Sequence, residues 1–126
     1  MDISEQRPHG ITTISKAHWD EVIVGDSRLK ESFYMGHDYA PTPWKTSGNQ
    51  IEQSDLEQLP IEHHELVLIG TGREMRLPRP DTLSYLSNIT TFEVMSTTSA
   101  CRTYNVIASE GRKILLAVFL GLEKSK

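Results

Sequence analysis

The stretch that decides the fold is "LVLIGTG", residues 66–72, an apolar run that ends in two glycines separated by a threonine. The segment from Glu65 to Ile69 predicts a β-strand that is buried on both faces, as strands of parallel sheets are. The turn Gly70-Thr71-Gly72 then leads out of this strand. Parallel strands are joined by crossover connections, which are usually helices, so we expect helices beside this segment in the sequence.

The sequence after this strand alternates between helix and strand. A short helix precedes it at residues 54–59, because Ser54 suits an N-cap and Pro60 stops the helix. Pro80 suits the first turn of a helix and Gly111 suits the residue after a helix. The predicted elements after the strand are helix 80–86, strand 91–95, helix 97–110 and strand 113–120. Two consecutive crossovers, which are right-handed almost without exception, indicate an α/β fold.

The N-terminal part is typical of short strands joined by turns. Gly25-Asp26-Ser27 suits a hairpin turn, because glycine adopts the positive φ that such turns need. The predicted strands here are residues 11–14, 21–24 and 29–35. Residues 36–53 predict a loop that either packs under Trp44 or is mobile. The predicted fold is therefore a mixed sheet, in which an N-terminal β-hairpin is added to a parallel βαβαβ core.

The long helix predicted at residues 97–110 has one face suited to packing on the sheet. At about 100° per residue, that face carries Ala100, Tyr104, Ile107 and Ala108. The small alanines allow close approach, and we expect the Tyr104 ring to be mostly buried. The opposite face is polar apart from one valine, and its members are Arg102, Val106, Ser109 and, at the boundary, Asn105.

Composition limits the classes of function. The chain has 126 residues, and we expect a single domain over residues 1–126 with an ordered core at about 10–120. Thirteen Lys and Arg against seventeen Asp and Glu give a net charge of −4, which provides no electrostatic reason to bind nucleic acid or anionic lipid. Cys101 is the only cysteine, which excludes an intrachain disulfide and a Cys-rich zinc site.

No targeting or membrane-spanning segment is expected. Residues 1–5 lack the basic start and apolar core of a signal peptide, and they are too acidic for a typical mitochondrial presequence. The longest apolar runs, residues 66–69 and 114–120, are far shorter than a membrane span. We therefore expect a cytoplasmic protein, and no motif indicates a cofactor or a metal.

The Gly70-Thr71-Gly72 turn has two interpretations. A dinucleotide-binding loop needs a third glycine and opens directly into a helix, and a P-loop needs a Gly-Lys-Ser/Thr ending. Both features are absent, which favours a plain turn at the end of a strand. The alternative is an anion site, since ligands of open α/β sheets bind outside the carboxyl ends of the strands.

The anion hypothesis joins this turn to the start of the long helix. Thr97 is expected to be the N-cap of that helix, and the free amides that follow it favour an anion. Arg102 or Arg73 would add positive charge. The residues of this possible crevice are Gly70, Thr71, Gly72, Thr97, Thr98 and Arg102.

Other candidate sites have simpler interpretations. His63-His64-Glu65 looks like a metal motif, but adjacent residues on an extended chain point in opposite directions, which favours solvated loop residues. Cys101 is near a helix N-terminus, which lowers a thiol pKa, yet a lone cysteine is more commonly a small buried hydrophobe. Residues 102–105 resemble an active-site cluster, but a buried Tyr104 with Arg102 paired on the surface is the favoured alternative.

Several short motifs resemble a known family. They are Gly70-Thr71-Gly72, Met95-x-Thr97, Ala100-Cys101, Arg102-Thr103-Tyr104-Asn105 and Glu110-Gly111-Arg112, together with Trp44 after a Pro-rich segment. Over about residues 10–120 the chain resembles the Mth-domain family of unknown function, which includes mitochondrial complex I assembly factor 3 and the adipogenesis-associated Mth domain-containing protein. The resemblance implies a three-layer α/β fold with a mixed central sheet, and it implies no particular catalytic activity, because none is established for the family. Its mitochondrial members act as assembly partners, so it also implies a protein partner.

Two functional hypotheses of different classes follow. The first is a non-catalytic interaction or assembly module with a protein partner, and it predicts an exposed apolar patch. The second is a small-anion-binding protein or enzyme that uses the crevice at Gly70–Gly72 and Thr97, and it predicts a deep pocket or an ordered anion there. The sequence favours the first.

Overall fold

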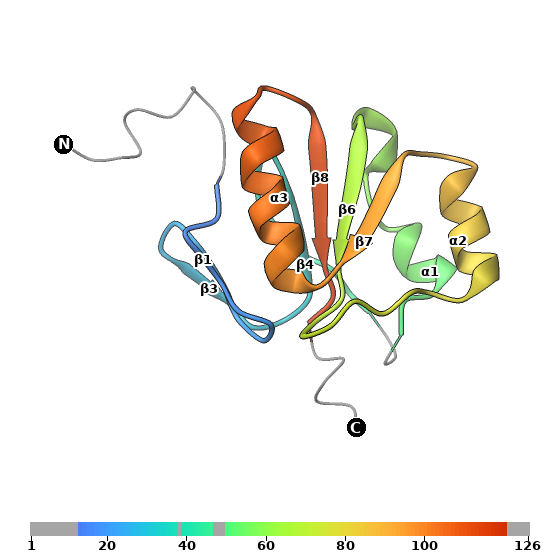
Figure 1. Cartoon of the computed structure of the whole chain (residues 1–126), viewed down its shortest axis with the longest axis horizontal. Coiled ribbons are helices and arrows are strands. Elements are labelled where there is room, and N and C mark those ends of the chain that lie inside the picture. Colours follow the sequence, from blue (N-terminus) through green and yellow to red (C-terminus); the bar gives the residue numbers. More distant parts are fainter. Residues whose placement is uncertain (1–12, 38, 47–49, 121–126) are drawn as a thin grey trace.

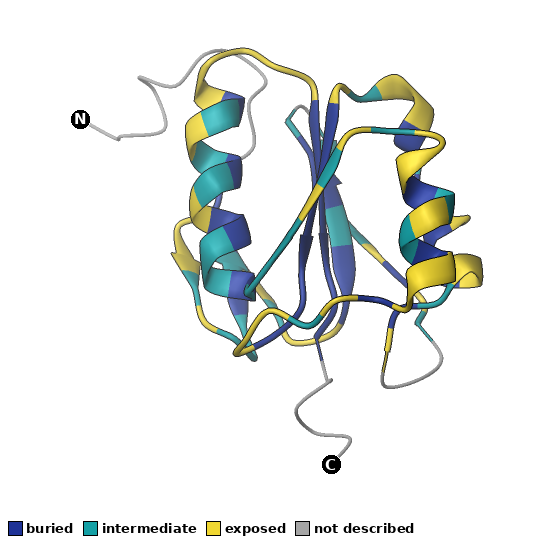
Figure 2. Cartoon of the chain, turned by 45° about the vertical axis from the view of Figure 1, so that its right-hand side comes forward, coloured by how far each residue is buried: buried dark blue, intermediate teal, exposed yellow. Residues whose placement is uncertain are grey.

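A computed structural model describes residues 13–37, 39–46 and 50–120 of the chain (Figure 1). This part of the protein contains a sheet of three strands and a sheet of five strands. Helices cover both faces of the larger sheet, so the protein has three layers (Figure 2). Within the described residues, no helix combines the length and the apolar sequence that crossing a bilayer requires.

The larger sheet confirms the predicted fold class. It consists of β4 (Phe33–Gly36), β5 (Tyr39–Pro43), β6 (Leu66–Gly70), β7 (Phe92–Met95) and β8 (Ile114–Val118), in the order β5-β4-β8-β6-β7. β6 is parallel to both β7 and β8, while β4 is antiparallel to both β8 and β5. An N-terminal hairpin, β4–β5, is thus added to a parallel βαβαβ core.

The hairpin predicted at the Gly25 turn lies in the smaller sheet and not in the central one, so its predicted placement is wrong. β1 (Lys16–Ala17), β2 (Val22–Val24) and β3 (Ser27–Leu29) pair antiparallel in that order. Gly25 has φ +59°, which confirms the glycine turn between β2 and β3. Of the strand predicted at residues 11–14, residues 11 and 12 lie outside the described residues and the rest is not in a strand.

The prediction of a single strand at residues 29–35 is wrong, because the chain leaves the smaller sheet after β3 and enters the larger sheet at β4 within this segment. Ser32 lies at this crossing, and its hydroxyl donates to the carbonyl of Leu120 at 3.1 Å and accepts from the amide of Leu120 at 2.9 Å. These bonds fix the start of β4 beside the end of β8.

The loop predicted at residues 36–53 is also wrong in part, because it contains the edge strand β5. The amide of Trp44 donates to the carbonyl of Ser32 at 3.0 Å. Hydrogen-bonded pairs alternate along an antiparallel ladder, so Pro41 and Pro43 occupy the positions that face away from β4. Proline at those positions loses no ladder hydrogen bond and blocks pairing at this edge.

The helices lie on opposite faces of the central sheet (Figure 1). One face is covered by α3 (Thr97–Ser109), and the other by α1 (Gln53–Leu56) and α2 (Pro80–Ser87). A single 3₁₀ turn, η2 (Ile61–His63), precedes β6. The alternation of side chains along β8 supplies both cores: one core contains Ile114, Leu116 and Val118, and the other contains Leu115, Ala117 and Phe119.

The predicted helix ends are confirmed at α2 and at the end of α3. Pro80 is in the first turn of α2, Asn88 is its C-cap, and Gly111 follows α3 with φ +82°. The expected Ser54 cap of the short helix is wrong. Instead Glu52 is the N-cap, and the carboxylate of Asp55 accepts from its amide at 2.8 Å. The predicted end at residue 59 is wrong as well, because α1 ends at Leu56.

The predicted inner face of α3 is confirmed. Tyr104, Ala100 and Ala108 have no exposed surface, and Ile107 is partly buried against the same core. The Tyr104 hydroxyl donates to the carbonyl of Gly36 at 2.8 Å, which connects α3 to the end of β4. Val106, the one apolar residue of the outer face, is 56% exposed.

Candidate functional site

The end of β6 meets the start of α3, so the structure brings together four of the sequence-predicted site residues. A β-carbon at Gly70 would lie 3.0 Å from the Cα of Thr97 and 3.3 Å from the Cβ of Ala100. Such a distance is tighter than ordinary van der Waals contact, so only glycine lets α3 approach β6 this closely. Thr71 and Thr97 are both buried at this junction.

The amides at this junction donate within the protein. The Gly72 amide donates to Oγ1 of Thr97 at 2.8 Å, and the Thr97 amide donates to the Gly72 carbonyl at 2.9 Å. The Thr71 amide donates to the Met95 carbonyl at 2.9 Å. An anion would have to displace the Thr97 hydroxyl to reach the Gly72 amide. Anion binding at this junction stays a prediction.

Thr97 is not the N-cap of α3, so that prediction is wrong. Ser96 is the N-cap, and its hydroxyl accepts from the Ser99 amide at 3.3 Å. The Thr97 side chain cannot act as the cap because it is turned toward Gly72. Of the remaining predicted residues, Thr98 is half-buried and Arg102 is exposed.

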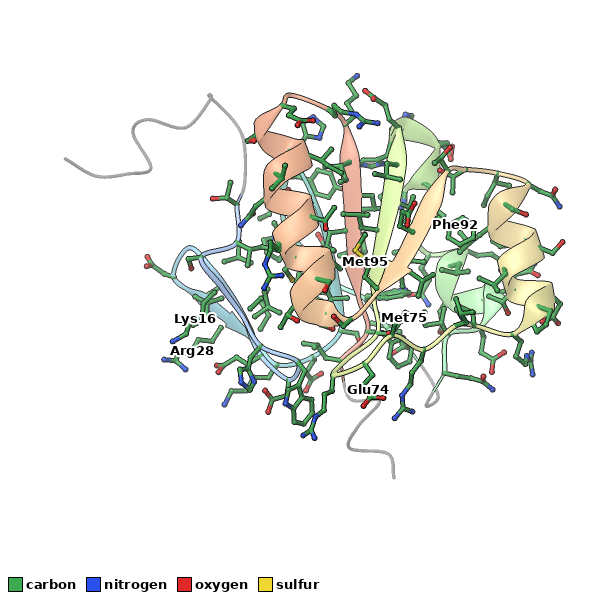
Figure 3. The ribbon with its side chains drawn as sticks, in the orientation of Figure 1. Lys16, Arg28, Glu74, Met75, Phe92 and Met95 are labelled. Carbon is green, nitrogen blue, oxygen red and sulfur yellow. The ribbon has the colours of Figure 1, made fainter. Side chains whose placement is uncertain are left out.

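The loop after β6 has a fixed backbone and exposed apolar side chains. Oγ1 of Thr71 accepts from the Arg76 amide at 2.9 Å and lies 2.9 Å from the Glu74 carbonyl, which it can donate to. Met75 is 51% exposed and Leu77 is 61% exposed, whereas Pro78 between the loop and α2 is buried. Figure 3 shows Met75 and Glu74 at the edge of the sheet where β6 ends.

Arginines flank these apolar side chains. The guanidinium carbon of Arg73 lies 4.6 Å from the centre of the Trp19 ring, a cation–π distance. Arg79 pairs with Glu52 at 3.0 Å and with Asp81 at 3.6 Å. Among the described residues, no carboxylate forms an ion pair with Arg73. We name the exposed side chains of Arg73, Met75 and Leu77 the Met75–Leu77 surface.

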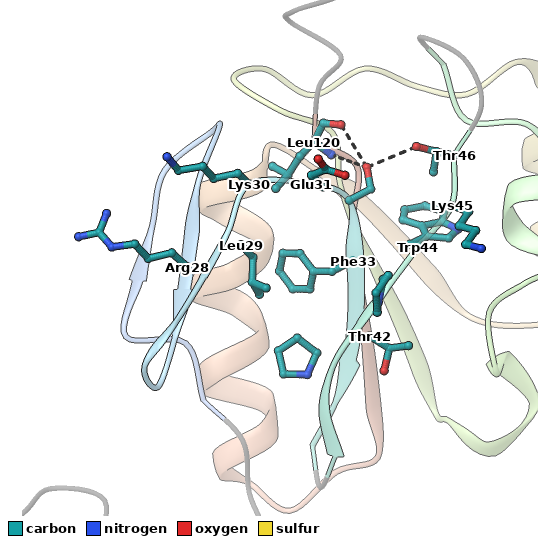
Figure 4. Close-up of a pocket in the computed structure, with 13 residues that line it drawn as sticks. Arg28, Leu29, Lys30, Glu31, Phe33, Thr42, Trp44, Lys45, Thr46 and Leu120 are labelled. Carbon is teal, nitrogen blue, oxygen red and sulfur yellow. Dashed lines mark hydrogen bonds between the residues drawn. The ribbon is translucent and has the colours of Figure 1, made fainter.

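A cavity lies between β3 and the β4–β5 hairpin, with a volume of about 830 Å³ (Figure 4). Leu29 and Phe33 give it an apolar interior, and Lys30 and Lys45 are among its basic lining residues. Ser32, its most buried hydroxyl, is already bonded to Leu120. Among its described lining residues, no nucleophile lies beside a base.

The remaining sequence candidates are a cysteine and a histidine pair. Cys101 is buried, and burial raises the pKa of its thiol from 9.0 to about 12, as befits a small core residue rather than a reactive thiol. In the described part of the chain, no group of three or more His, Cys, Asp or Glu side chains is arranged to hold a metal. The expectation of solvated loop histidines holds for exposed His63 but is wrong for His64, which is half-buried and bonded through both ring nitrogens.

Sequence reasoning missed the contribution of Trp19 and the exposure of the loop. Trp19 is 54 positions from Arg73 in the sequence, and no spacing rule connects residues of a separate sheet to this loop. Met75 and Leu77 alternate with Arg76 and Pro78, and that alternation was the available signal.

Proteins similar to this chain in sequence or in structure come from several bacteria. The "13 kDa major membrane protein" of Francisella tularensis subsp. holarctica (strain LVS) is 29% identical over 65 residues, which are 51% of this chain and 53% of that protein. The match therefore spans about half the length of that curated relative. A crystal structure from Bordetella parapertussis has a TM-score of 0.78 and 26% identity, covering 90% of this chain and 99% of that one.

A solution structure from Bordetella pertussis, described as a Mth938-like domain, has a TM-score of 0.72 and 21% identity, and covers 100% of this chain and 98% of that one. At this identity it supports the fold alone. The family described as "Protein of unknown function (DUF498/DUF598)" matches residues 14–119, which include both sheets and all the helices described above. The chain therefore belongs to the DUF498 family.

Proposed function

We propose that this protein is a non-catalytic interaction module that binds a protein partner at the Met75–Leu77 surface. The observation that carries the proposal is the exposure of two large apolar side chains, 51% for Met75 and 61% for Leu77, on one loop. Thr71 holds the backbone of that loop. An apolar loop that is already ordered loses less conformational entropy on binding than a flexible one.

The charges of the loop indicate the chemistry of the partner. Residues 73–79 contain three Arg and one Glu, which gives 3 − 1 = +2 in a chain whose net charge is −4. Glu52 and Asp81 offset the charge of Arg79, whereas no described carboxylate forms an ion pair with Arg73, which lies over the Trp19 ring. A partner segment with an apolar side chain next to a carboxylate would complement this surface in both respects.

The resemblance to assembly factors supports a protein as the ligand, and in this proposal the chain is assembly-factor-like. A membrane surface is the competing ligand, because one relative is named a major membrane protein. Arginine beside exposed apolar side chains also suits an anionic bilayer. The test therefore includes lipid.

The test compares two variants that change surface residues only. Met75→Ser/Leu77→Ser removes the apolar side chains, and Val106→Ser is the matched control, because Val106 is 56% exposed on the outer face of α3. All three proteins are expected to melt at similar temperatures. Each is used to capture partners from its native cells, and the captured protein is then purified and titrated by calorimetry.

We expect the wild type and Val106→Ser to bind the purified partner equally, and the double variant to bind at least tenfold more weakly. A partner that binds the double variant as tightly as the wild type contradicts the proposal. The proposal is also contradicted if the wild type and Val106→Ser sediment with vesicles of anionic phospholipid while the double variant does not. The ligand of this surface would then be a membrane.

A further inference from the structure

A second cavity lies at the end of the central sheet where β6 and β8 begin, which is opposite the end that carries the Met75–Leu77 surface. Its volume is about 410 Å³, at the small end of the range of roughly 300–1,000 Å³ seen for ligand sites. The polar side chains that line it are Tyr34, His37, Tyr39, Thr42, His63, His64 and Lys113. We name it the Tyr39–His64 cavity.

Four separate segments build this cavity. Tyr34 and Thr42 are opposite one another on β4 and β5, so both side chains are on the same face of the sheet. The sequence predicts an extended chain at His63 and His64, whose side chains would then point in opposite directions. The 3₁₀ turn η2 replaces that extended backbone, and both histidines line the cavity together with Tyr34 and Thr42. Gly36 leaves room for the Tyr39 ring, since a β-carbon at Gly36 would overlap that ring.

The hydrogen bonds of His64 fix the direction of donation. Nδ1 of His64 lies 2.7 Å from the Pro60 carbonyl, which can only accept, so Nδ1 carries a proton. In the neutral ring Nε2 is then an acceptor, and the Tyr39 hydroxyl, 3.2 Å away, donates to it. The Tyr39 and His64 rings also meet edge to face, with 6.0 Å between their centres. Tyr39 and His64 are therefore held in place before any ligand arrives.

The charge of the lining favours an anion. Lys113 is its only Lys or Arg, and no carboxylate is among the described residues that line it. Glu65, which follows His64 in the sequence, is used elsewhere: its carboxylate lies 3.4 Å from Nε of Arg112 and accepts from the backbone amide of Lys113 at 3.4 Å. A charge-assisted contact to an anion is about twice as strong as a neutral hydrogen bond.

We propose that the Tyr39–His64 cavity binds a small aromatic anion whose charged group is a carboxylate or a phosphate. Lys113 contacts the charged group, and the rings of Tyr34 and Tyr39 pack against the flat body. This site is independent of the Met75–Leu77 surface, which lies at the other edge of the sheet, where β6 ends.

Three probes test the proposal by amide chemical shifts of the ¹⁵N-labelled chain: benzoate, phenyl phosphate and benzyl alcohol. We expect the amides of Tyr34, Tyr39, His64 and Lys113 to shift and saturate with at least one of the two anions. The anion that binds identifies the charged group. Neutral benzyl alcohol has the same ring and is expected to cause no saturable shift.

Two variants connect the shifts to the named residues. Lys113→Gln is expected to raise the Kd of the anion about tenfold, because it removes the charge-assisted contact. Lys16→Gln, at an exposed lysine of β1, is the matched control and is expected to leave the Kd unchanged. Tyr39→Phe keeps the ring but frees His64 Nε2, so it is expected to alter the shift pattern around His64.

Several results would overturn the proposal. They are no saturable shift with either anion, equal binding of benzyl alcohol, or an unchanged Kd in Lys113→Gln. Shifts confined to Gly70, Gly72 and Thr98 would also overturn it and would instead favour the anion site predicted at the junction of β6 and α3. None of these results depends on Met75 or Leu77, so failure here leaves the proposed interaction surface untouched.

Discussion

Asn105 on α3 holds Ile14 by both polar atoms of its side chain. Nδ2 of Asn105 donates to the Ile14 carbonyl at 2.8 Å, and Oδ1 accepts from the Ile14 amide at 2.9 Å. The two residues are 91 positions apart. This pair of bonds attaches the chain just before β1 to α3, so it positions the small sheet against the central one.

Replacing Asn105 should therefore loosen the small sheet. Asn105→Ala leaves a part-buried amide and carbonyl without partners, which is expected to lower the free energy of unfolding by about 1–3 kcal/mol. Urea unfolding measures the loss, and Arg102→Ala, at an exposed position of the same helix, is the control. Asn105→Asp tests the geometry, because it keeps the acceptor and loses the donor. Equal stability of Asn105→Ala and Arg102→Ala would show that the pair contributes nothing.

Tyr104 should contribute through both its ring and its hydroxyl. Tyr104→Phe leaves the Gly36 carbonyl without its 2.8 Å donor and is expected to cost about 1–2 kcal/mol. Tyr104→Ala also leaves a cavity and is expected to cost about 3 kcal/mol or more. Thermal and urea unfolding measure both losses. The idea that this ring is core would be wrong if Tyr104→Ala melted like the parent.

Thr71 should control the shape of the loop after β6. Thr71→Val keeps the volume but removes the acceptor of the Arg76 amide and is expected to cost about 1–2 kcal/mol. Hydrogen exchange of the Arg76 amide should become faster, and the partner should bind the Met75–Leu77 surface more weakly. Thr90→Val is the control, because the Thr90 hydroxyl makes only a 3.3 Å contact with its neighbouring carbonyl. Unchanged exchange at Arg76 would remove Thr71 from this role.

Cys101 should make stability fall at alkaline pH. Burial raises the pKa of the thiol from 9.0 to about 12, so the folded chain keeps its proton where the unfolded chain loses it. The stabilising contribution is complete below pH 9 and declines between about pH 9 and 12, by at most about 1.4 kcal/mol per pH unit. Urea unfolding of the wild type and Cys101→Ala from pH 8 to about 10.5 isolates the thiol, because every other group is shared. Parallel stability curves for the two proteins would contradict the prediction.

The C-terminal half of the fold was predictable because local signals determine it. Leu66–Gly70 is apolar at every position and ends in a glycine turn, as interior strands do, and Pro80 and Gly111 mark helix ends by their backbone preferences alone. The register of such strands follows from the same apolar pattern.

The N-terminal half depends on contacts between distant residues, and these leave no local pattern. Ser32 divides one predicted strand into two because it is bonded to Leu120, 88 positions later. Pro41 and Pro43 resemble loop residues, and only their place at a sheet edge makes a strand possible.

The candidate sites were less predictable than the fold. The sequence located the Gly70–Gly72 turn correctly. It did not reveal that the Gly72 amide donates to the hydroxyl of Thr97, because the direction of the Thr97 side chain depends on packing. Tyr39 and His64 are 25 positions apart and meet only because a 3₁₀ turn redirects the chain.

The order of strands along the chain has a consequence for synthesis on the ribosome. β6 is flanked in the sheet by β7 and β8, and both of these strands are made after it. β8 also provides the only pairing that joins the β4–β5 hairpin to the parallel strands among the described residues. Until residues 114–118 leave the ribosome, the nascent chain therefore carries two incomplete sheets with open apolar edges, which are the kind of edges that chaperones bind and that aggregate when exposed. Translation that stops short of β8 leaves a product without its central strand, so the sheet is completed only when β8, the last of its five strands along the chain, has been made.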